Sequence, residues 1–304
     1  MHAFPAEAAL SYSDLPPVLI VGTSDAARER GRHTILNAGF RVADAVDLDA
    51  APARLRLQGA ASALWLELDD DAGPGLDTVL ACARQDLAQK RYGAVVSLTP
   101  DLIEPVFAQM EGTDVEYVVD GSAADRATAL AIITSAFMPF RTNDVASDQN
   151  NARLRQLSDE VSRIAATLAR LSTGPGQPTR IQPMPTSMDV PDVAVDTVRA
   201  VIRARRLRSR FFDEELFADP AWDMLLDLLQ AELAQLRVPV SSLCIAAAVP
   251  ATTALRWLKT MTNQGLFVRR ADPHDGRRVF VELDPAASMA MRRYFAEVGN
   301  PATI

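Results

Sequence analysis

The chain has 304 residues, of which 48% are hydrophobic and 23% charged, a composition typical of folded globular proteins and not of disordered ones. This length leaves room for two domains of ordinary size. No apolar run is long enough to span a membrane, and the first residues lack the basic and apolar regions of a signal peptide. The two cysteines, Cys82 and Cys244, lie far apart, which argues against a disulfide. We therefore expect a cytoplasmic protein that does not enter a membrane.

The formal net charge of −8 is unevenly distributed along the sequence. From Val193 onward there are 15 Lys and Arg against 13 Asp and Glu, whereas the residues before it carry 16 against 26. Within Pro250–Val281, six basic residues stand against two acidic ones. Exposed charges are screened beyond about a Debye length, so a nucleic acid would respond to this local excess. The acidic first half is then expected to face away from DNA.

The region from Pro17 to about Pro139 alternates strand-like apolar runs with helical stretches. The expected strands are Val18–Gly22, Phe40–Val46, Ala63–Leu68, Ala94–Thr99 and Val115–Val119. The expected helices are Asp25–Ala38, Gly75–Gln89, Pro100–Met110 and Ser122–Phe137. Alternation of this kind predicts a parallel, doubly wound α/β sheet. We assign this domain to residues 1–140.

A narrow apolar seam marks residues 151–172, where hydrophobic side chains recur at alternating spacings of three and four residues. This heptad pattern predicts a coiled-coil helix that pairs two copies of the chain, and we assign it to residues 141–172. The dimerisation residues are expected to be Leu154, Leu157, Val161, Ile164, Leu168 and Leu171. The alternative is an amphipathic helix that packs on its own domain. The next segment, residues 173–191, is rich in Pro, Gly, Thr and Ser, which predicts a flexible linker.

Residues 192–304 predict a helical domain that contains a β-hairpin. Four helices are expected at Thr197–Phe212, Ala221–Leu236, Ser242–Val249 and Pro285–Val298. Ser241 is expected to cap the third of them. Between the third and the fourth, an amphipathic helix that starts after Pro250 and ends at Gly265 is followed by two short strands within Leu266–Leu283. A helix pair followed by a basic hairpin is the plan of a winged helix-turn-helix, an α+β fold that contacts DNA with both elements.

The polar face of the amphipathic helix is expected to contact DNA. Ala254, Leu258 and Met261 recur at helical spacing and should face the core instead. Short hydroxyl side chains at the start of such a helix can approach bases or phosphates, and an arginine one turn later can form two hydrogen bonds with a guanine. Arginines at the hairpin tip suit a narrow minor groove. The predicted DNA-binding residues are Ser242, Thr252, Thr253, Arg256, Lys259, Thr260, Arg270, Arg277 and Arg278. The alternative for the hairpin is a solvated surface.

The helix at Thr197–Phe212 carries a run of arginines. The predicted auxiliary contacts to DNA phosphates are Arg203, Arg205, Arg206 and Arg208. The alternative is a solvated face beside a dimer interface.

Residues 252–283 read TTALRWLKTMTNQGLFVRRADPHDGRRVFVEL and resemble the recognition helix and wing of MarR-type winged-helix regulators. The resemblance extends over about Trp222–Leu283 and includes the Gly-Leu step into the wing and the turn Asp272–Arg278. It implies a major-groove position for Thr252, Thr253 and Arg256 and a minor-groove position for Arg277. Members of that family usually pair through helices that flank the winged helix, whereas this chain has a separate candidate dimerisation helix.

The strand and helix spacing of the first domain resembles a response-regulator receiver. Aspartyl phosphorylation in that fold needs an acidic pair after the first strand, an aspartate ending the third, a hydroxyl ending the fourth and a lysine ending the fifth. Here the first strand is followed by Gly22-Thr23-Ser24, and the third offers Glu67 with Asp69–Asp71 beyond it. Thr99 is in place on the fourth strand, but the fifth ends in Val119-Asp120-Gly121 without a lysine. The resemblance therefore implies a degenerate receiver that serves interaction or dimerisation.

No catalytic constellation is recognisable. The three histidines are scattered, and neither a metal-binding spacing nor a dinucleotide fingerprint occurs. We predict a non-enzymatic, homodimeric transcription regulator of the bacterial nucleoid, without cofactor or metal. The expected partners are double-stranded DNA, a second copy of the chain and a regulatory protein at the first domain. Two alternatives stand beside this prediction: a signalling adaptor whose winged helix binds protein, and a response regulator that is phosphorylated.

Overall fold

A computed structural model gives the structure of residues 17–58, 61–110, 112–137 and 190–299. These residues belong to one compact unit, which contains an α/β domain and a winged helix that contact each other. The predicted coiled coil, with its dimerisation residues from Leu154 to Leu171, lies outside the described residues. So does the predicted linker up to residue 189.

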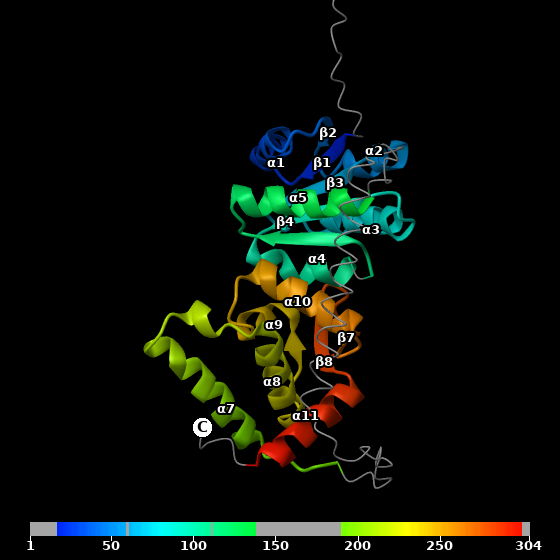
Figure 1. Cartoon of the computed structure of the whole chain (residues 1–304). Helices are drawn as coiled ribbons and strands as arrows, with labels where there is room; N and C mark the ends of the chain where they lie inside the picture. The colour runs from blue at the N-terminus through cyan, green and yellow to red at the C-terminus, as the bar shows by residue number, and fades with distance from the viewer. Residues whose placement is uncertain (1–16, 59–60, 111, 138–189, 300–304) are drawn as a thin grey trace, which may run out of the picture. The chain divides into compact units, whose positions relative to one another are not determined.

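The α/β domain is built around a parallel sheet of five strands in the order β2-β1-β3-β4-β5 (Figure 1). Its strands are β1 Val18–Gly22, β2 Val42–Val46, β3 Ala63–Leu68, β4 Gly93–Leu98 and β5 Val115–Val119. Its helices are α1 Asp25–Asn37, α2 Ala51–Leu57, α3 Pro74–Ala88, α4 Ile103–Gln109 and α5 Ala123–Phe137. This strand order is that of flavodoxin-like sheets, to which receivers belong. The predicted doubly wound α/β fold is confirmed.

Helices cover both faces of this sheet. Val18, Ile20 and Trp65 pack with α1 and α5 on one face. Leu19 and Leu66 belong to the core on the other face, to which α2, α3 and α4 contribute. Because successive strand residues point to opposite faces, a continuous apolar run such as β1 supplies both cores.

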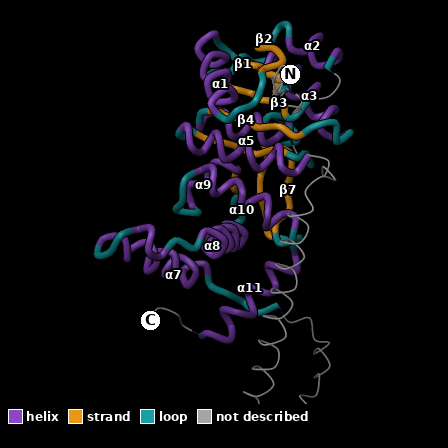
Figure 2. Tube along the Cα trace, turned by 45° about the horizontal axis from the view of Figure 1, so that its top comes forward, coloured by secondary structure: helices purple, strands orange, loops and turns teal. Residues whose placement is uncertain are grey.

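The second domain is a winged helix with a further helix on either side. Its helices are α7 Val195–Leu207, α8 Pro220–Leu233, α9 Val240–Ala246, α10 Ala251–Asn263 and α11 Pro285–Val298. Its strands are β6 Val238–Pro239, β7 Phe267–Ala271 and β8 Val279–Leu283. They form an antiparallel sheet in the order β6-β8-β7, separate from the parallel sheet in Figure 2. The predicted winged helix is confirmed.

Aspartate-proline pairs begin two of these helices. Asp219 caps α8 by accepting a hydrogen bond from the backbone N–H of Trp222 at 3.3 Å, and Asp284 caps α11 through Ala286 at 2.9 Å. The proline that follows each aspartate has no N–H to leave unpaired in the first turn. These local signals explain why the sequence predicts both helix starts closely.

Two details of the winged helix differ from expectation. Helix α7 ends at Leu207, earlier than predicted, and the chain continues as a 3-10 turn over Arg208–Arg210. The N-cap of α9 is the extended Pro239, so Ser241 lies inside the helix and does not cap it. The reason is a competing partner, because the backbone N–H and the hydroxyl of Ser241 both donate to Glu104 Oε1 in α4, at 2.7 and 2.8 Å.

Among the described helices, none is long and apolar enough to cross a membrane by itself. Helices α9 and α10 pass such a test of length and composition only as a pair, and they are bent by 108° at their junction.

Replacing Leu66, which is fully buried in β3, by alanine should lower the free energy of unfolding by about 2–5 kcal/mol, because apolar contact is lost and a cavity remains. The matched variant Leu57→Ala removes the same atoms from an 82% exposed position and should cost less than about 0.5 kcal/mol. Denaturant titration followed by circular dichroism measures both. Equal losses would contradict the assigned core.

Candidate nucleic-acid interface

Helix α10 has one apolar and one polar face. Ala254, Leu258 and Met261 are buried in the winged-helix core, as predicted. On the opposite side, the side chains of Thr252, Arg256 and Lys259 are only partly exposed. We call these three residues together with Arg277 of the hairpin the recognition face.

The turn of the wing is shaped by its own carboxylates. The backbone N–H of Asp272 donates to the carbonyl of Arg278 at 3.0 Å, and that of Arg278 donates to the carbonyl of Asp275 at 3.0 Å. The Asp275 carboxylate accepts from the backbone N–H of Arg277 at 3.0 Å and lies 3.4 Å from Arg278 Nε. Asp275 therefore fixes the backbone that presents both arginines.

The remaining predicted DNA-binding residues lie around this face. Ser242 is exposed on α9, and Thr253 is partly exposed on α10. The hydroxyl of Thr260 donates to the carbonyl of Arg256 at 2.9 Å, within its own helix. Arg270 is exposed on β7 and pairs across the hairpin with Glu282, at 3.5 Å.

The predicted phosphate-contacting arginines of α7 and of the 3-10 turn that follows it divide into two kinds. Arg203, Arg206 and Arg208 are exposed. Arg205 instead bridges to α8, with its Nε 2.6 Å from Asp223 Oδ1 and its side chain only 16% exposed. Arg205 thus holds the two helices together in this structure.

The recognition face contacts β5, the last strand of the parallel sheet. Arg256 Nε donates to Glu116 Oε2 at 2.9 Å. The hydroxyl oxygen of Thr252 accepts from the backbone N–H of Val119 at 2.9 Å, and Lys259 Nζ donates to the carbonyl of Val115 at 3.2 Å. The polar side of the recognition helix therefore lies against protein.

The wing tip contacts the same domain through two aspartates. Arg277 donates to Asp71 at 2.6 Å, and its Nε lies 3.3 Å from Asp77 Oδ1. The hydrogen bond from Arg277, with one from the backbone of Gly73, holds the pKa of Asp71 below its usual range. The same pairing raises the pKa of Arg277, which stays charged.

Two further contacts join α4 to the winged helix. Glu104 of α4 accepts hydrogen bonds from Ser241 of α9. Burial raises the pKa of the nearby Cys244 thiol to about 12, and the negative charge of Glu104 contributes to this rise. The guanidinium of Arg269 lies 4.3 Å from the ring centre of Phe107. We call Asp71, Asp77, Glu104, Phe107 and Glu116, together with the free side of the β5 backbone, the covering surface.

The covering surface gives the predicted DNA-binding residues a neighbour that the sequence did not indicate. The acidic half of the chain was predicted to face away from DNA, yet four of its carboxylates lie on the winged helix, and those of Asp71, Asp77 and Glu116 pair with arginines predicted to bind DNA. Charge counts along a sequence give the net charge of each segment, but they do not tell which other segment it contacts in the fold. An acidic domain and a basic face on one chain attract each other when the fold brings them within contact.

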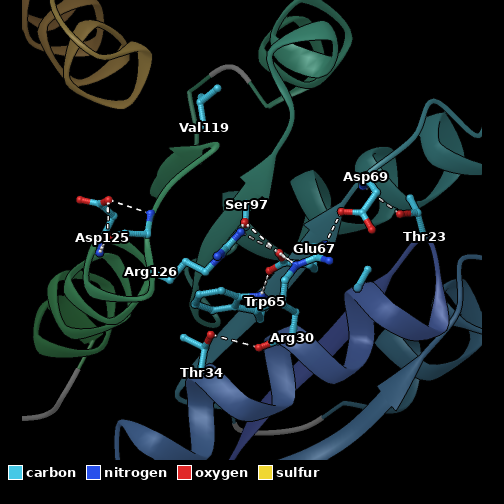
Figure 3. Close-up of polar contacts among 12 residues, drawn as sticks. Thr23, Arg30, Thr34, Trp65, Glu67, Asp69, Ser97, Val119, Asp125 and Arg126 are labelled. Carbon is cyan, nitrogen blue, oxygen red and sulfur yellow. Dashed lines mark hydrogen bonds and ion pairs between the residues drawn. The ribbon is translucent and has the colours of Figure 1, made fainter.

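A polar network occupies the carboxyl ends of β3 and β4, where a receiver would be phosphorylated (Figure 3). Glu67 is 1% exposed and lies at its centre. It accepts from Arg30 Nε at 3.0 Å, from the indole N–H of Trp65 at 2.8 Å and from the Ser97 hydroxyl at 3.1 Å. Arg126 lies 3.4 Å from the same carboxylate. Two guanidinium groups thus neutralise this buried charge.

The aspartate beyond β3 is also engaged. Asp69 pairs with Arg30 and accepts from the Ser24 hydroxyl at 3.2 Å, while its backbone N–H donates to Thr23 Oγ1 at 2.9 Å. Within the part of the chain that the structure describes, no three acidic, histidine or cysteine side chains are grouped so as to hold a metal. The sequence analysis missed this network, because Arg30 and Arg126 lie on helices far from Glu67 in the sequence. Glu67 itself was visible as a charged residue inside an otherwise apolar strand.

Residues 235–287 match a family model described as a winged helix DNA-binding domain. The match includes α9, α10 and both wing strands. It covers less than half of the chain, so it characterises this region alone. No curated protein sequence matches the chain.

Three solved structures are similar over about a third of the chain, each with a TM-score of 0.21. BpsR from Bordetella bronchiseptica, solved to explain how 6-hydroxynicotinic acid regulates its DNA binding, is 22% identical over 33% of this chain and 74% of its own. The adhesin competence repressor AdcR from Streptococcus pyogenes is 15% identical over 34% and 71%. The transcriptional regulator Tm0710 from Thermotoga maritima is 19% identical over 34% and 75%.

Replacing Glu67 by glutamine should lower the free energy of unfolding by about 3–5 kcal/mol, because it removes the anion from a buried cluster and leaves two guanidinium groups undercompensated. Glu282→Gln is the matched control. It removes the partner of Arg270 at a half-exposed position and should cost less than about 1 kcal/mol. Chemical denaturation of the full chain compares them, and similar small effects would show that the cluster is not structural.

Proposed function

We propose that the protein is a sequence-specific DNA-binding transcription regulator. The observation that carries this proposal is the basic recognition face on a helix and wing within a region that matches winged helix DNA-binding domains. A helix of this kind fits the major groove, and a hairpin beside it reaches a neighbouring minor groove or phosphates.

Each predicted residue has a role in this proposal. Thr252, Thr253 and Arg256 would contact base edges from the start of α10, and Arg277 would enter the minor groove. The phosphate contacts would come from Ser242, Lys259, Thr260, Arg270 and Arg278. Arg203 and Arg206 of α7 and Arg208 of the following 3-10 turn would be auxiliary ones. Arg205 would act indirectly, by holding α7 on α8.

The regulator would act as a homodimer joined through residues 141–172. Two linked winged helices gain affinity because the second binds at the high effective concentration set by the first. The α/β domain, a degenerate receiver in this proposal, would serve interaction and not phosphoryl transfer, because Arg30 and Arg126 already pair with Glu67 and the end of β5 carries no lysine.

Selection of genomic DNA fragments by the purified chain at moderate salt tests the proposal. An enriched motif with two related half-sites is the expected result. Purely non-specific, salt-sensitive binding would contradict sequence specificity, and the absence of binding at low salt would contradict DNA binding altogether.

Arg256→Ala should weaken binding to the enriched motif by about 10-fold or more while changing binding to random DNA much less, because a lost base contact costs roughly 1–3 kcal/mol. Arg203→Ala removes an exposed arginine of α7 and should weaken both by the same factor, since phosphate contacts carry no sequence information. Fluorescence anisotropy with both DNAs measures the ratio. Equal losses for Arg256→Ala on the two DNAs would contradict the base contact.

Ile164→Glu should convert the dimer to a monomer, because a charge in an a/d seam removes the apolar contact between the helices. Ser162→Glu adds the same charge off the predicted seam and should leave the dimer intact. Light scattering coupled to size exclusion gives the mass of each. A dimer that survives Ile164→Glu would assign the pairing to another surface.

A signalling adaptor is the second candidate, and one observation favours it: the polar face of α10 already contacts protein. The salt dependence of binding separates the two functions. Neutralisation of several phosphates makes DNA affinity fall steeply with salt, by a slope of roughly −0.9 per phosphate contact, whereas a protein partner gives a shallow dependence.

A further inference from the structure

We propose that the α/β domain competes with DNA for the recognition face, so that the chain binds DNA only when the covering surface has moved away. This inference rests on the proposed function, since it concerns the regulation of the same site. It is carried by the contacts of both DNA-binding elements, helix and wing, with one domain.

The recognition helix cannot lie on β5 and in a DNA groove at once. A helix in the major groove presents its outer face to the base edges, and Thr252, Arg256 and Lys259 share that face. In the structure all three contact β5, two of them through backbone atoms of the strand. Because the strand lies where the bases would lie, α10 cannot contact β5 and enter a major groove at the same time.

The covering surface also presents carboxylates to the arginines of the recognition face. Arginines that suit guanine or phosphate are held by carboxylates, Arg256 by Glu116 at 2.9 Å and Arg277 by Asp71 and Asp77 at 2.6 and 3.3 Å. The covering surface therefore offers anions to the same guanidinium groups that nucleic acid would engage. DNA can bind only by replacing them.

The recognition helix also covers the edge of the parallel sheet. Within the described strands β5 is the last of its sheet, and its outward backbone groups have no strand to pair with. The hydroxyl of Thr252 and the ammonium of Lys259 satisfy two of them. The recognition helix thus supplies hydrogen-bond partners to the edge strand. This pairing stabilises the contact between the recognition face and the covering surface, which we call the covered form, in addition to charge attraction.

The covered form, in which the recognition face contacts the covering surface, can open because its ion pairs are weak. Arg256 and Arg277 keep 40% and 31% of their side-chain surface exposed, and exposed ion pairs are weak and screened by salt. The apparent affinity for DNA then equals the intrinsic affinity multiplied by the fraction of molecules that are uncovered. A change that destabilises the covered form should tighten DNA binding.

Two variants of the full chain, each with a matched control, test this inference. Glu116→Lys places a like charge against Arg256. Glu29→Lys makes the same change of net charge on α1, where Glu29 pairs with Arg32 and His33 of its own helix. Asp71→Asn loosens the wing tip, and Asp44→Asn removes an equally exposed aspartate paired with Arg54, the two side chains being 47% and 48% exposed.

The measurement is anisotropy of a labelled random-sequence duplex at low salt and of the enriched fragment at moderate salt. Relative to its control, Glu116→Lys should tighten binding by about tenfold, because a like charge in a partly buried pair strongly disfavours the covered form. Asp71→Asn should tighten it by about two- to fourfold, as expected for a more exposed pair. Unfolding midpoints show whether each variant is folded. Because Asp71 is more exposed, Asp71→Asn still tests the inference if Glu116→Lys does not fold.

Hydrogen exchange gives a second readout on the unaltered chain. The backbone N–H of Val119 is protected by Thr252 and by no strand on that side. Saturating DNA should therefore raise the exchange rate of the β5 segment while it lowers that of α10.

The possible results distinguish a failure of the competition between β5 and DNA from a failure of the proposed DNA-binding function. Tighter binding by the variants with faster exchange of β5 on DNA supports the competition. Binding by the unaltered chain that neither variant tightens, with β5 exchange unchanged on DNA, overturns the competition and leaves the DNA-binding function standing. A failure of every variant to bind DNA at low salt overturns the proposed function, and the competition with it.

Discussion

Strand β5 ends the parallel sheet, and one side of its backbone therefore has no strand beside it. Peptide groups need hydrogen-bond partners, and a bare edge invites pairing with other chains unless something covers it. Here the cover is helix α10, whose Thr252 and Lys259 provide the hydroxyl oxygen and the ammonium that the edge requires. The contact between the two domains follows from this requirement, because the polar side chains that suit a strand edge are also those that suit DNA.

A different requirement, a buried charge that needs neutralising, acts on the central strand β3 near its carboxyl end. Glu67 sits in a strand whose other residues are apolar, and it is tolerated because Arg30 and Arg126 reach it from helices on one face. The carboxyl ends of β3 and β4 in this receiver-like sheet therefore hold a cluster in which two guanidinium groups balance the buried carboxylate.

The fold follows from the sequence wherever local rules act. Alternating apolar runs and helical stretches predict the five strands, and the Asp-Pro pair at Asp284 predicts the start of α11 to the residue. The seven-residue α2 was missed, since it is too short to show a period, and β6 has only two residues. The sequence indicates which residues of the winged helix could bind DNA, but not which residues of the α/β domain contact them. Arg256 and Glu116 are 140 residues apart, and no spacing rule links two such positions.

This separation explains how an acidic chain can be a DNA-binding one. A sequence pI of about 5.0 argues against nucleic acid only if all charges face the same solvent. When the acidic domain lies on the basic face, its carboxylates stop acting as long-range repulsion and become a short-range competitor that DNA must replace. The competitor is held on the same chain, so its effective concentration is high and independent of dilution. In this proposal the carboxylates of the covering surface determine how strongly the recognition face is withheld from DNA, and the residues of that face determine what it binds once released.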